Sequence, residues 1–64
     1  MRRGDLLRHL RRYGCTLKRE GRSHSLWQNP ATGTVEAVPR HNEIANQLAR
    51  KICRALSIPE LGRE

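Results

Sequence analysis

The sequence contains no phenylalanine, one tryptophan and one tyrosine among its 64 residues, and 36% of it is hydrophobic. A chain of this length forms one domain, residues 1–64, and so small a domain buries only about 60% of its unfolded surface. With few large side chains to fill the interior, we expect a thin core and no pocket that could enclose a cofactor. A shallow site that reads a large substrate fits this size better, and we predict that the protein uses no cofactor.

Several kinds of segment and motif are also absent. No apolar run approaches the roughly 18 residues of a membrane-spanning helix, and charges interrupt the first ten residues, unlike a secretory signal. We therefore expect a cytoplasmic protein without membrane contact. Cys15 and Cys53 lie far apart and show no C-x-x-C spacing, so we expect two reduced, buried thiols and no metal site. No carboxylate pair, nucleophile elbow or glycine-rich phosphate loop points to a common enzyme class.

Positive charge is what the sequence has in abundance. The 13 Lys and Arg residues outnumber the 6 Asp and Glu residues, which gives a net charge of +7, and most of the cations are arginine. The arginine side chain forms paired hydrogen bonds to phosphate oxygens, as nucleic-acid recognition requires. We therefore expect a polyanionic partner, either RNA, DNA or an acidic protein. A charged surface that binds only solvent is the alternative.

Helical periodicity is found at both ends of the chain. Apolar residues recur on one arc over residues 5–13, which predicts a helix with Asp5 at its positive N-terminal end and Gly14 just beyond its C-terminus. A second amphipathic helix is predicted over residues 43–56, with Asn42 as its N-cap. Residues 61–64 are expected to form a tail.

The segment between the helices predicts three strands. Residues 15–20 alternate apolar and polar, residues 23–28 alternate less cleanly, and residues 34–38 are rich in residues that favour strands. Short turns rich in Gly, Pro and Asn join them, which predicts an antiparallel meander. The expected fold is α+β, in the order α-β-β-β-α, with both helices packed on one face of a three-stranded antiparallel sheet. The other face of the sheet is left open.

The side chains best suited to catalysis surround the start of the second predicted strand. His24 follows Arg22 and Ser23, and it lies across a turn from Lys18 and Arg19. A neutral imidazole accepts protons near neutral pH, and cations beside it bind a phosphodiester and stabilise charge that develops on it. These groups suffice in principle to cleave RNA without a metal, with His24 taking the proton of a ribose 2′-OH. Taken alone, the residues leave a structural or RNA-contacting His24 as the alternative.

A second basic cluster, Arg40 and His41, precedes the last predicted helix. Free backbone N–H groups at a helix N-terminus attract phosphate, and these two side chains would add to that attraction. A helix cap with incidental charge is the alternative. Trp27 could stack on a base, but the single tryptophan of a chain without phenylalanine is expected to pack in the core.

Strand alternation leaves one question open. Successive side chains of a strand point to opposite faces, so His24 shares a face with Leu26, and Ser25 shares the other face with Trp27. Each pair contains one large apolar residue, and one of these must lie near the open face. The pattern therefore does not decide which face carries His24.

Two segments resemble the HicA family, small toxins of bacterial and archaeal toxin–antitoxin pairs that act as mRNA interferases. GRSHSLWQNP at residues 21–30 is similar to the family's Gly-Ser-His-His or Gly-Arg-His segment. VPRHNEI at residues 38–44 is similar to its Val-Pro-x-His segment, which leads into the last helix. Their order and spacing in a chain of this size make the resemblance specific, and it extends over nearly the whole chain.

The resemblance implies a fold like the double-stranded-RNA-binding domain and a toxin that cleaves mRNA as a metal-independent endoribonuclease. It also implies that His24 is the single catalytic histidine and that a HicB-type antitoxin covers the active surface. The residues that we expect to contact RNA are Lys18, Arg19, Arg22, Ser23, Arg40 and His41. A non-catalytic RNA-binding module of the same fold is the alternative function.

Two positions depart from the commoner family pattern. Arg22 stands before Ser23 where many members have glycine directly, and Ser25 replaces the second histidine of the commoner segment. If that second histidine assists catalysis in some members, the assistance is missing here. The resemblance then predicts a weaker or differently selective nuclease.

Overall fold

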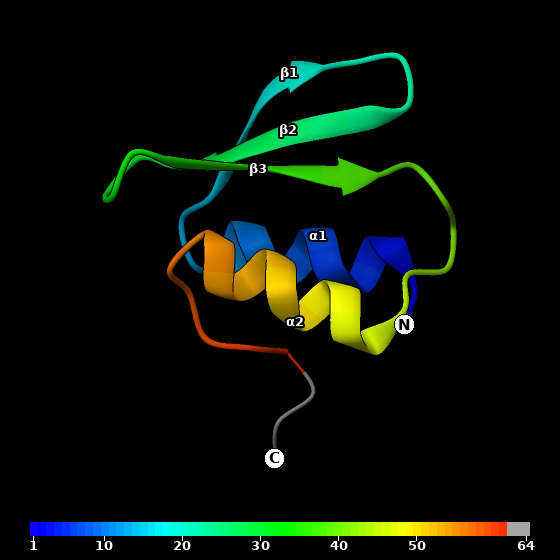
Figure 1. Ribbon diagram of the computed structural model, residues 1–64. Helices are drawn as coiled ribbons and strands as arrows, with labels where there is room; N and C mark the ends of the chain where they lie inside the picture. Colours follow the sequence, from blue (N-terminus) through cyan, green and yellow to red (C-terminus); the bar gives the residue numbers. More distant parts are fainter. Residues whose placement is uncertain (62–64) are drawn as a thin grey trace.

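Two helices and a three-stranded antiparallel sheet follow one another in the order α-β-β-β-α in the computed structural model, which describes residues 1–61 (Figure 1). The elements are α1 (Arg3–Arg12), β1 (Thr16–Glu20), β2 (His24–Asn29), β3 (Thr34–Pro39) and α2 (Asn46–Ala55). Both helices lie on one side of the sheet (Figure 1), which confirms the expected α+β architecture. Neither of these helices is long and apolar enough to cross a membrane. Of the predicted tail, residues 62–64 lie outside the described residues.

The strand β2 forms the middle of the sheet, between β1 and β3. Its pairing with β3 is regular from His24, opposite Pro39, to Asn29, opposite Thr34. Its pairing with β1 shifts between Leu17 and Arg19, so that the residue between them forms a bulge. The central strand therefore places its first residue beside the last residue of β3.

Burial along β2 determines which side chains face the helices. Ser25, Trp27 and Asn29 are buried, whereas His24 is exposed and the intervening residues of the strand are half-buried. Because the helices cover one face of the sheet, the buried set points toward them and His24 lies on the open face. This answers the question that strand alternation left open. Trp27 is 2% exposed, which confirms that it packs in the core.

The core lies between the sheet and the two helices. Its buried hydrophobic members are Leu6, Leu10, Cys15, Trp27, Val38, Ile44, Ala49, Ile52, Cys53, Leu56 and Ile58. The two cysteines are free and buried, as predicted. Burial raises the pKa of both thiols, so that each remains neutral and behaves as a small apolar side chain.

The helix boundaries differ from the predicted ones. The helix α1 begins at Arg3 rather than at residue 5, and α2 begins at Asn46 rather than at residue 43. The predicted cap by Asn42 is therefore wrong. Its carbonyl oxygen accepts a hydrogen bond from the Arg3 N–H (2.8 Å), and the Ile44 N–H donates to the carbonyl oxygen of Met1 (2.8 Å). Residues 42–44 thus pair with residues 1–3, and this pairing delays the start of α2.

Tyr13 also departs from the expected pattern. It follows the last residue of α1 and is 41% exposed, although it was predicted on the apolar arc of the helix. Its ring lies 4.9 Å from the His9 ring, measured between centroids. The His9 Nε2 atom lies 2.7 Å from the carbonyl oxygen of Pro59. This cluster on the helical layer joins the end of α1 to the segment that follows α2.

Asn29 ties the β2–β3 turn to the end of α2, and we predict that its side chain contributes to stability. Its buried Nδ2 donates to the carbonyl oxygen of Leu56 (2.8 Å), and its Oδ1 accepts from the Ala31 N–H (3.0 Å). Because Asn29→Ala leaves the carbonyl of Leu56 without this donor, it should lower the free energy of unfolding by about 1–3 kcal/mol. Urea denaturation measures the change.

The adjacent amide supplies the control. Gln28 is half-buried on the opposite face of β2, and its side chain makes a single long contact of 3.5 Å to the Thr16 hydroxyl. Gln28→Ala should change the free energy of unfolding by less than about 0.5 kcal/mol. Equal effects of the two substitutions would show that the turn is not held through Asn29.

Candidate active site

Three segments of the chain meet at the end of the sheet where β2 begins and β3 ends (Figure 1). His24 pairs with Pro39, so Arg40 and His41 continue the chain from this same end. The loop that follows β1 leads directly into His24. We call this region the His24 end, and its predicted site residues are all exposed: Arg22, Ser23, His24, Arg40 and His41. The fold therefore gathers two separate basic segments around the candidate catalytic histidine.

The other two predicted contacts, Lys18 and Arg19, lie on β1. Arg19 is opposite Leu26, and residues that pair across strands share a face, so Arg19 lies on the open face with His24. Lys18 is the extra residue of the bulge and has no partner in β2. Both side chains are exposed. The fold thus extends positive charge from the His24 end along the edge strand.

A tight turn fixes the position of His24. The Gly21 N–H donates to the carbonyl oxygen of His24 (2.8 Å), which holds the start of β2 against the end of β1. A Cβ atom at Gly21 would lie 2.8 Å from that same oxygen, closer than such atoms approach in folded proteins. Since the oxygen belongs to the backbone, it cannot move aside as a side chain could. The turn into His24 therefore requires glycine at this position.

An arginine of α1 reaches the strands on the helix side of the sheet. The Nε of Arg3 donates to the carbonyl oxygen of Pro39 (2.7 Å), and its Nη2 donates to Ser25 Oγ (2.9 Å). The Ser25 hydroxyl, which is buried, donates to Glu20 Oε1 (2.6 Å). One side chain of the helical layer is thereby connected to all three strands at the end where His24 lies.

The same carboxylate oxygen of Glu20 also binds Arg40. The Arg40 Nη2 donates to Glu20 Oε1 (2.9 Å) and to the carbonyl oxygen of Gly21. The hydrogen bond from Ser25 and the charge of Arg40 lower the pKa of Glu20. The Glu20 and Arg40 side chains are 52% and 44% exposed, so this pair lies at the surface. We call Arg3, Glu20, Ser25 and Arg40 the Glu20 network.

The amino-acid sequence alone predicted no role for Arg3 or Glu20. Their contacts join residues far apart in the chain, since 22 positions separate Arg3 from Ser25 and 20 separate Glu20 from Arg40. No local pattern signals such contacts. Ser25 itself lies on the helix side of the sheet and not on the face of His24.

The structure also changes the setting of Arg40 and His41. These residues were expected to lie directly before the last helix, where phosphate could bind its free N–H groups. The helix α2 begins only at Asn46, and residues 42–44 pair with the start of the chain. Arg40 and His41 therefore belong to the end of β3 rather than to a helix N-terminus.

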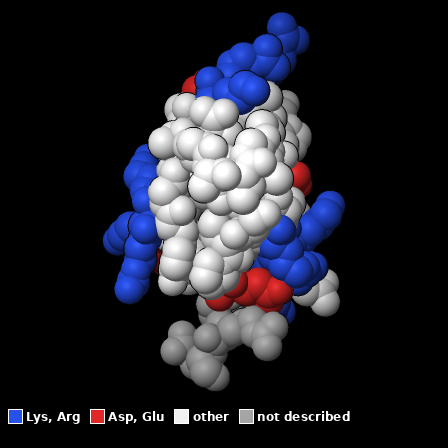
Figure 2. Space-filling view, turned by 90° about the vertical axis from the view of Figure 1, so that its left-hand side faces the viewer, with Lys and Arg blue, Asp and Glu red and all other residues white. Residues whose placement is uncertain are grey.

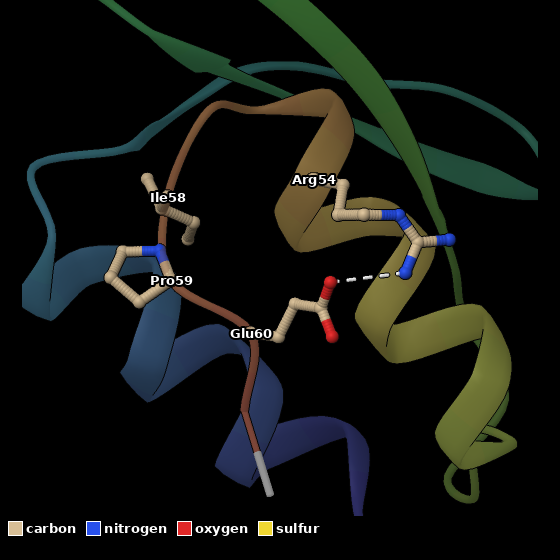
Figure 3. A pocket seen from close by; sticks show the side chains of 4 residues that line it. All are labelled: Arg54, Ile58, Pro59 and Glu60. Atoms are coloured by element: carbon tan, nitrogen blue, oxygen red, sulfur yellow. Dashed lines mark hydrogen bonds and ion pairs between the residues drawn. The ribbon is translucent and has the colours of Figure 1, made fainter. Parts of the chain in front are cut away.

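Three hollows of the surface lie away from His24. One of about 410 Å³ is lined by Arg54, Ile58, Pro59 and Glu60, and Figure 3 shows the Glu60 carboxylate turned toward the Arg54 guanidinium. These two groups form an ion pair of 3.1 Å, so their charges offset each other. Two further hollows, of about 240 and 500 Å³, are lined by residues of α1 and its neighbours. None of the three is lined by His24. Because His24 and the residues around it are exposed, the candidate site is a surface.

Figure 2 views the molecule from the side of the turn between β2 and β3, away from the His24 end. Lys and Arg side chains surround a largely uncharged area in this view. Within residues 1–61, no group of three or more His, Cys, Asp or Glu side chains is placed to hold a metal ion. The chemical groups of the His24 end are two imidazoles, two guanidinium groups and a hydroxyl.

Comparison with known proteins gives one match. A family model described as the HicA toxin of bacterial toxin–antitoxin systems matches residues 3–58. The search of curated proteins found no match, and neither did the search of solved structures. The matched range includes all five elements and the whole of the His24 end.

The turn at Gly21 leads to a prediction with opposite signs at two glycines. Gly21→Ala should lower the free energy of unfolding by at least about 1 kcal/mol, because its Cβ meets the backbone oxygen of His24. Gly4 lies in α1 with nothing within 4 Å of a built Cβ, so Gly4→Ala should raise the stability by up to about 1 kcal/mol.

Thermal denaturation and a two-dimensional amide NMR spectrum measure both variants. The spectrum of Gly21→Ala should show shifted resonances for residues 20–24, whereas that of Gly4→Ala should change only around α1. A Gly21→Ala protein with wild-type stability and an unshifted His24 amide would show that the turn does not depend on glycine.

Proposed function

This chain belongs to the HicA toxin family of bacterial toxin–antitoxin systems, and from that premise we propose that it is an endoribonuclease that cleaves mRNA. Membership implies an antitoxin as partner, and we propose a HicB-type antitoxin that covers the open face of the sheet. The observation that carries the proposal is the position of His24, which is exposed on that face between two basic segments. An exposed site suits a polymeric substrate that no pocket of this small protein could enclose.

His24 acts as the general base in the proposed reaction. Its ring makes no hydrogen bond or ion pair within residues 1–61, so both ring nitrogens are available to a substrate. The imidazole takes the proton of a ribose 2′-OH, and the 2′-oxygen attacks the adjacent phosphorus. The P–O5′ bond breaks, and the 5′-oxygen leaves with its electron pair and takes a proton from solvent. The products are a 2′,3′-cyclic phosphate and a 5′-hydroxyl end.

The surrounding cations hold the substrate and stabilise the charge that develops on the phosphate. The proposed RNA contacts are Lys18, Arg19, Arg22, Ser23, Arg40 and His41. Within residues 1–61, Arg40 uses only its Nη2, so the other N–H groups of its guanidinium remain available to a phosphate oxygen. This division of donors lets one residue serve both the fold and the substrate.

We predict that His24→Ala lowers the rate of RNA cleavage by at least about 100-fold, because the substitution removes the proposed general base. Cleavage of a labelled RNA by the purified protein measures the rate, and induced expression in bacteria measures growth arrest. The variant should keep its fold and its binding to the antitoxin, since the His24 side chain is exposed. His9→Ala is the matched control, because His9 lies on α1 in the opposite layer, and it should cleave at the wild-type rate.

The alternative function, a non-catalytic RNA-binding module, makes a different prediction. It expects RNA binding that weakens steeply with salt and no new RNA ends in the presence of the wild-type protein. If purified His24→Ala cleaved RNA at the wild-type rate, the protein would still be a nuclease, but His24 would not be its general base.

The chemistry of the substrate gives a second prediction. An RNA with a single 2′-deoxy nucleotide on the 5′ side of the cleaved bond should resist cleavage at that bond, because the attacking oxygen is missing. Neighbouring bonds should still be cut. Mass spectrometry of the wild-type products should find cyclic phosphate and 5′-hydroxyl ends. A 5′-phosphate end would show that water, and not the 2′-oxygen, attacks the phosphorus.

A further inference from the structure

We propose that Glu20 and Arg40 are positioning residues for His24, a role that rests on the proposed function. Neither needs to touch the reacting atoms for this role. They act through the turn at Gly21, which joins β1 to the first residue of β2. Three contacts converge on that turn, and each uses a different part of it.

Gly21 is held at both of its backbone polar groups. Its N–H donates to the carbonyl oxygen of His24 (2.8 Å), and its carbonyl oxygen accepts from Arg40 Nη2. Glu20, the residue before it, accepts from the same Nη2 (2.9 Å). The turn that leads into His24 is thus fixed to the segment after β3. Without Arg40, the exposed loop of residues 21–23 loses its link to that segment.

Glu20 in turn fixes Arg40. A long arginine side chain at the surface has many rotamers, and a carboxylate that accepts its hydrogen bond selects one of them. Glu20 is itself held by the hydroxyl of buried Ser25, which Arg3 also contacts. The position of Arg40 is therefore set from the helical layer through two intervening side chains.

The negative charge of Glu20 does not by itself help an RNA-cleaving site. A carboxylate beside the expected phosphate contacts repels RNA, so its removal should strengthen RNA binding. Glu20 also adds little to the free energy of unfolding, because a half-exposed ion pair contributes little to folding. The contacts that Glu20 does make all lead to Arg40, Ser25 and the turn. Positioning is the function that these contacts support.

Glu20→Ala tests the proposal with opposite signs on two kinetic constants. We expect kcat for RNA cleavage to fall about 10- to 100-fold, because the base is misplaced, while KM stays the same or falls, because a negative charge is lost. Glu20→Gln keeps an acceptor oxygen for Ser25 and Arg40 and should restore most of kcat. Glu36→Ala is the matched control, because it removes one negative charge from β3 opposite Trp27, and it should leave kcat unchanged.

Hydrogen exchange of the Gly21 amide tests the turn without reference to activity. We expect this N–H to exchange at least 10-fold faster in Glu20→Ala than in wild type, and at the wild-type rate in Glu36→Ala. Circular dichroism confirms that each variant is folded. If Glu20→Ala is not, Arg40→Ala removes the same contact from the other side, and its Gly21 amide should exchange at least 10-fold faster. A folded Glu20→Ala protein with unchanged kcat would overturn the proposal, whatever the exchange rate.

The two proposals fail in different ways. If the wild-type protein cuts no RNA, the proposed function is wrong, and the catalytic part of the positioning role is rejected with it. If the wild type cuts RNA and Glu20→Ala cuts it with the same kcat, only the positioning role is wrong. A drop in kcat with slower or unchanged exchange of Gly21 would also reject it, because the turn would not be the route of the effect.

Discussion

The guanidinium of Arg3 is the contact on which the His24 end of the sheet depends. It donates to the carbonyl oxygen of Pro39 and to the hydroxyl of Ser25, and so joins α1 to β3 and to the central strand. Buried polar groups are costly unless they are hydrogen-bonded, so the buried Ser25 hydroxyl is tolerated because both neighbours bond to it. From there the bonds continue to Glu20 and Arg40. A charged network on the helix side of the sheet thus supports an exposed histidine on the other side.

This arrangement explains how a protein of 64 residues without phenylalanine can present a site at all. Its core is one layer of aliphatic and cysteine side chains with a single tryptophan, which leaves no interior volume for a substrate. The proposed site therefore uses the outer face of a sheet whose inner face packs against that core along β2 and β3. The rigidity that a deep pocket would provide has to come from bonds to the backbone, and at Gly21 both polar groups are so bonded.

Local patterns were enough to predict the order of elements, the buried cysteines and the packing of Trp27. Each depends on features confined to a short segment, such as alternation in a strand or a repeated apolar arc. The start of α2 was mispredicted, because residues 42–44 pair with residues 1–3, and a pairing between distant segments leaves no trace in either one. The face of His24 and the partners of Arg40 depend in the same way on how the helices cover the sheet. The resemblance pointed to His24, but only the fold shows that His24 and Ser25 lie on opposite faces of the sheet.

The bulge at Lys18 bears on how the molecule behaves beside copies of itself. The strand β1 is an edge of the sheet, and a regular edge strand offers its free N–H and C=O groups to the edge of another molecule. The bulge interrupts this regular spacing, and the three charged residues 18–20 place like and unlike charges along the same edge. The opposite edge, β3, ends at Pro39, which has no N–H to donate. The bulged border of this small sheet thus resists strand-to-strand aggregation, and Pro39 limits the length of the other, while the broad face stays open.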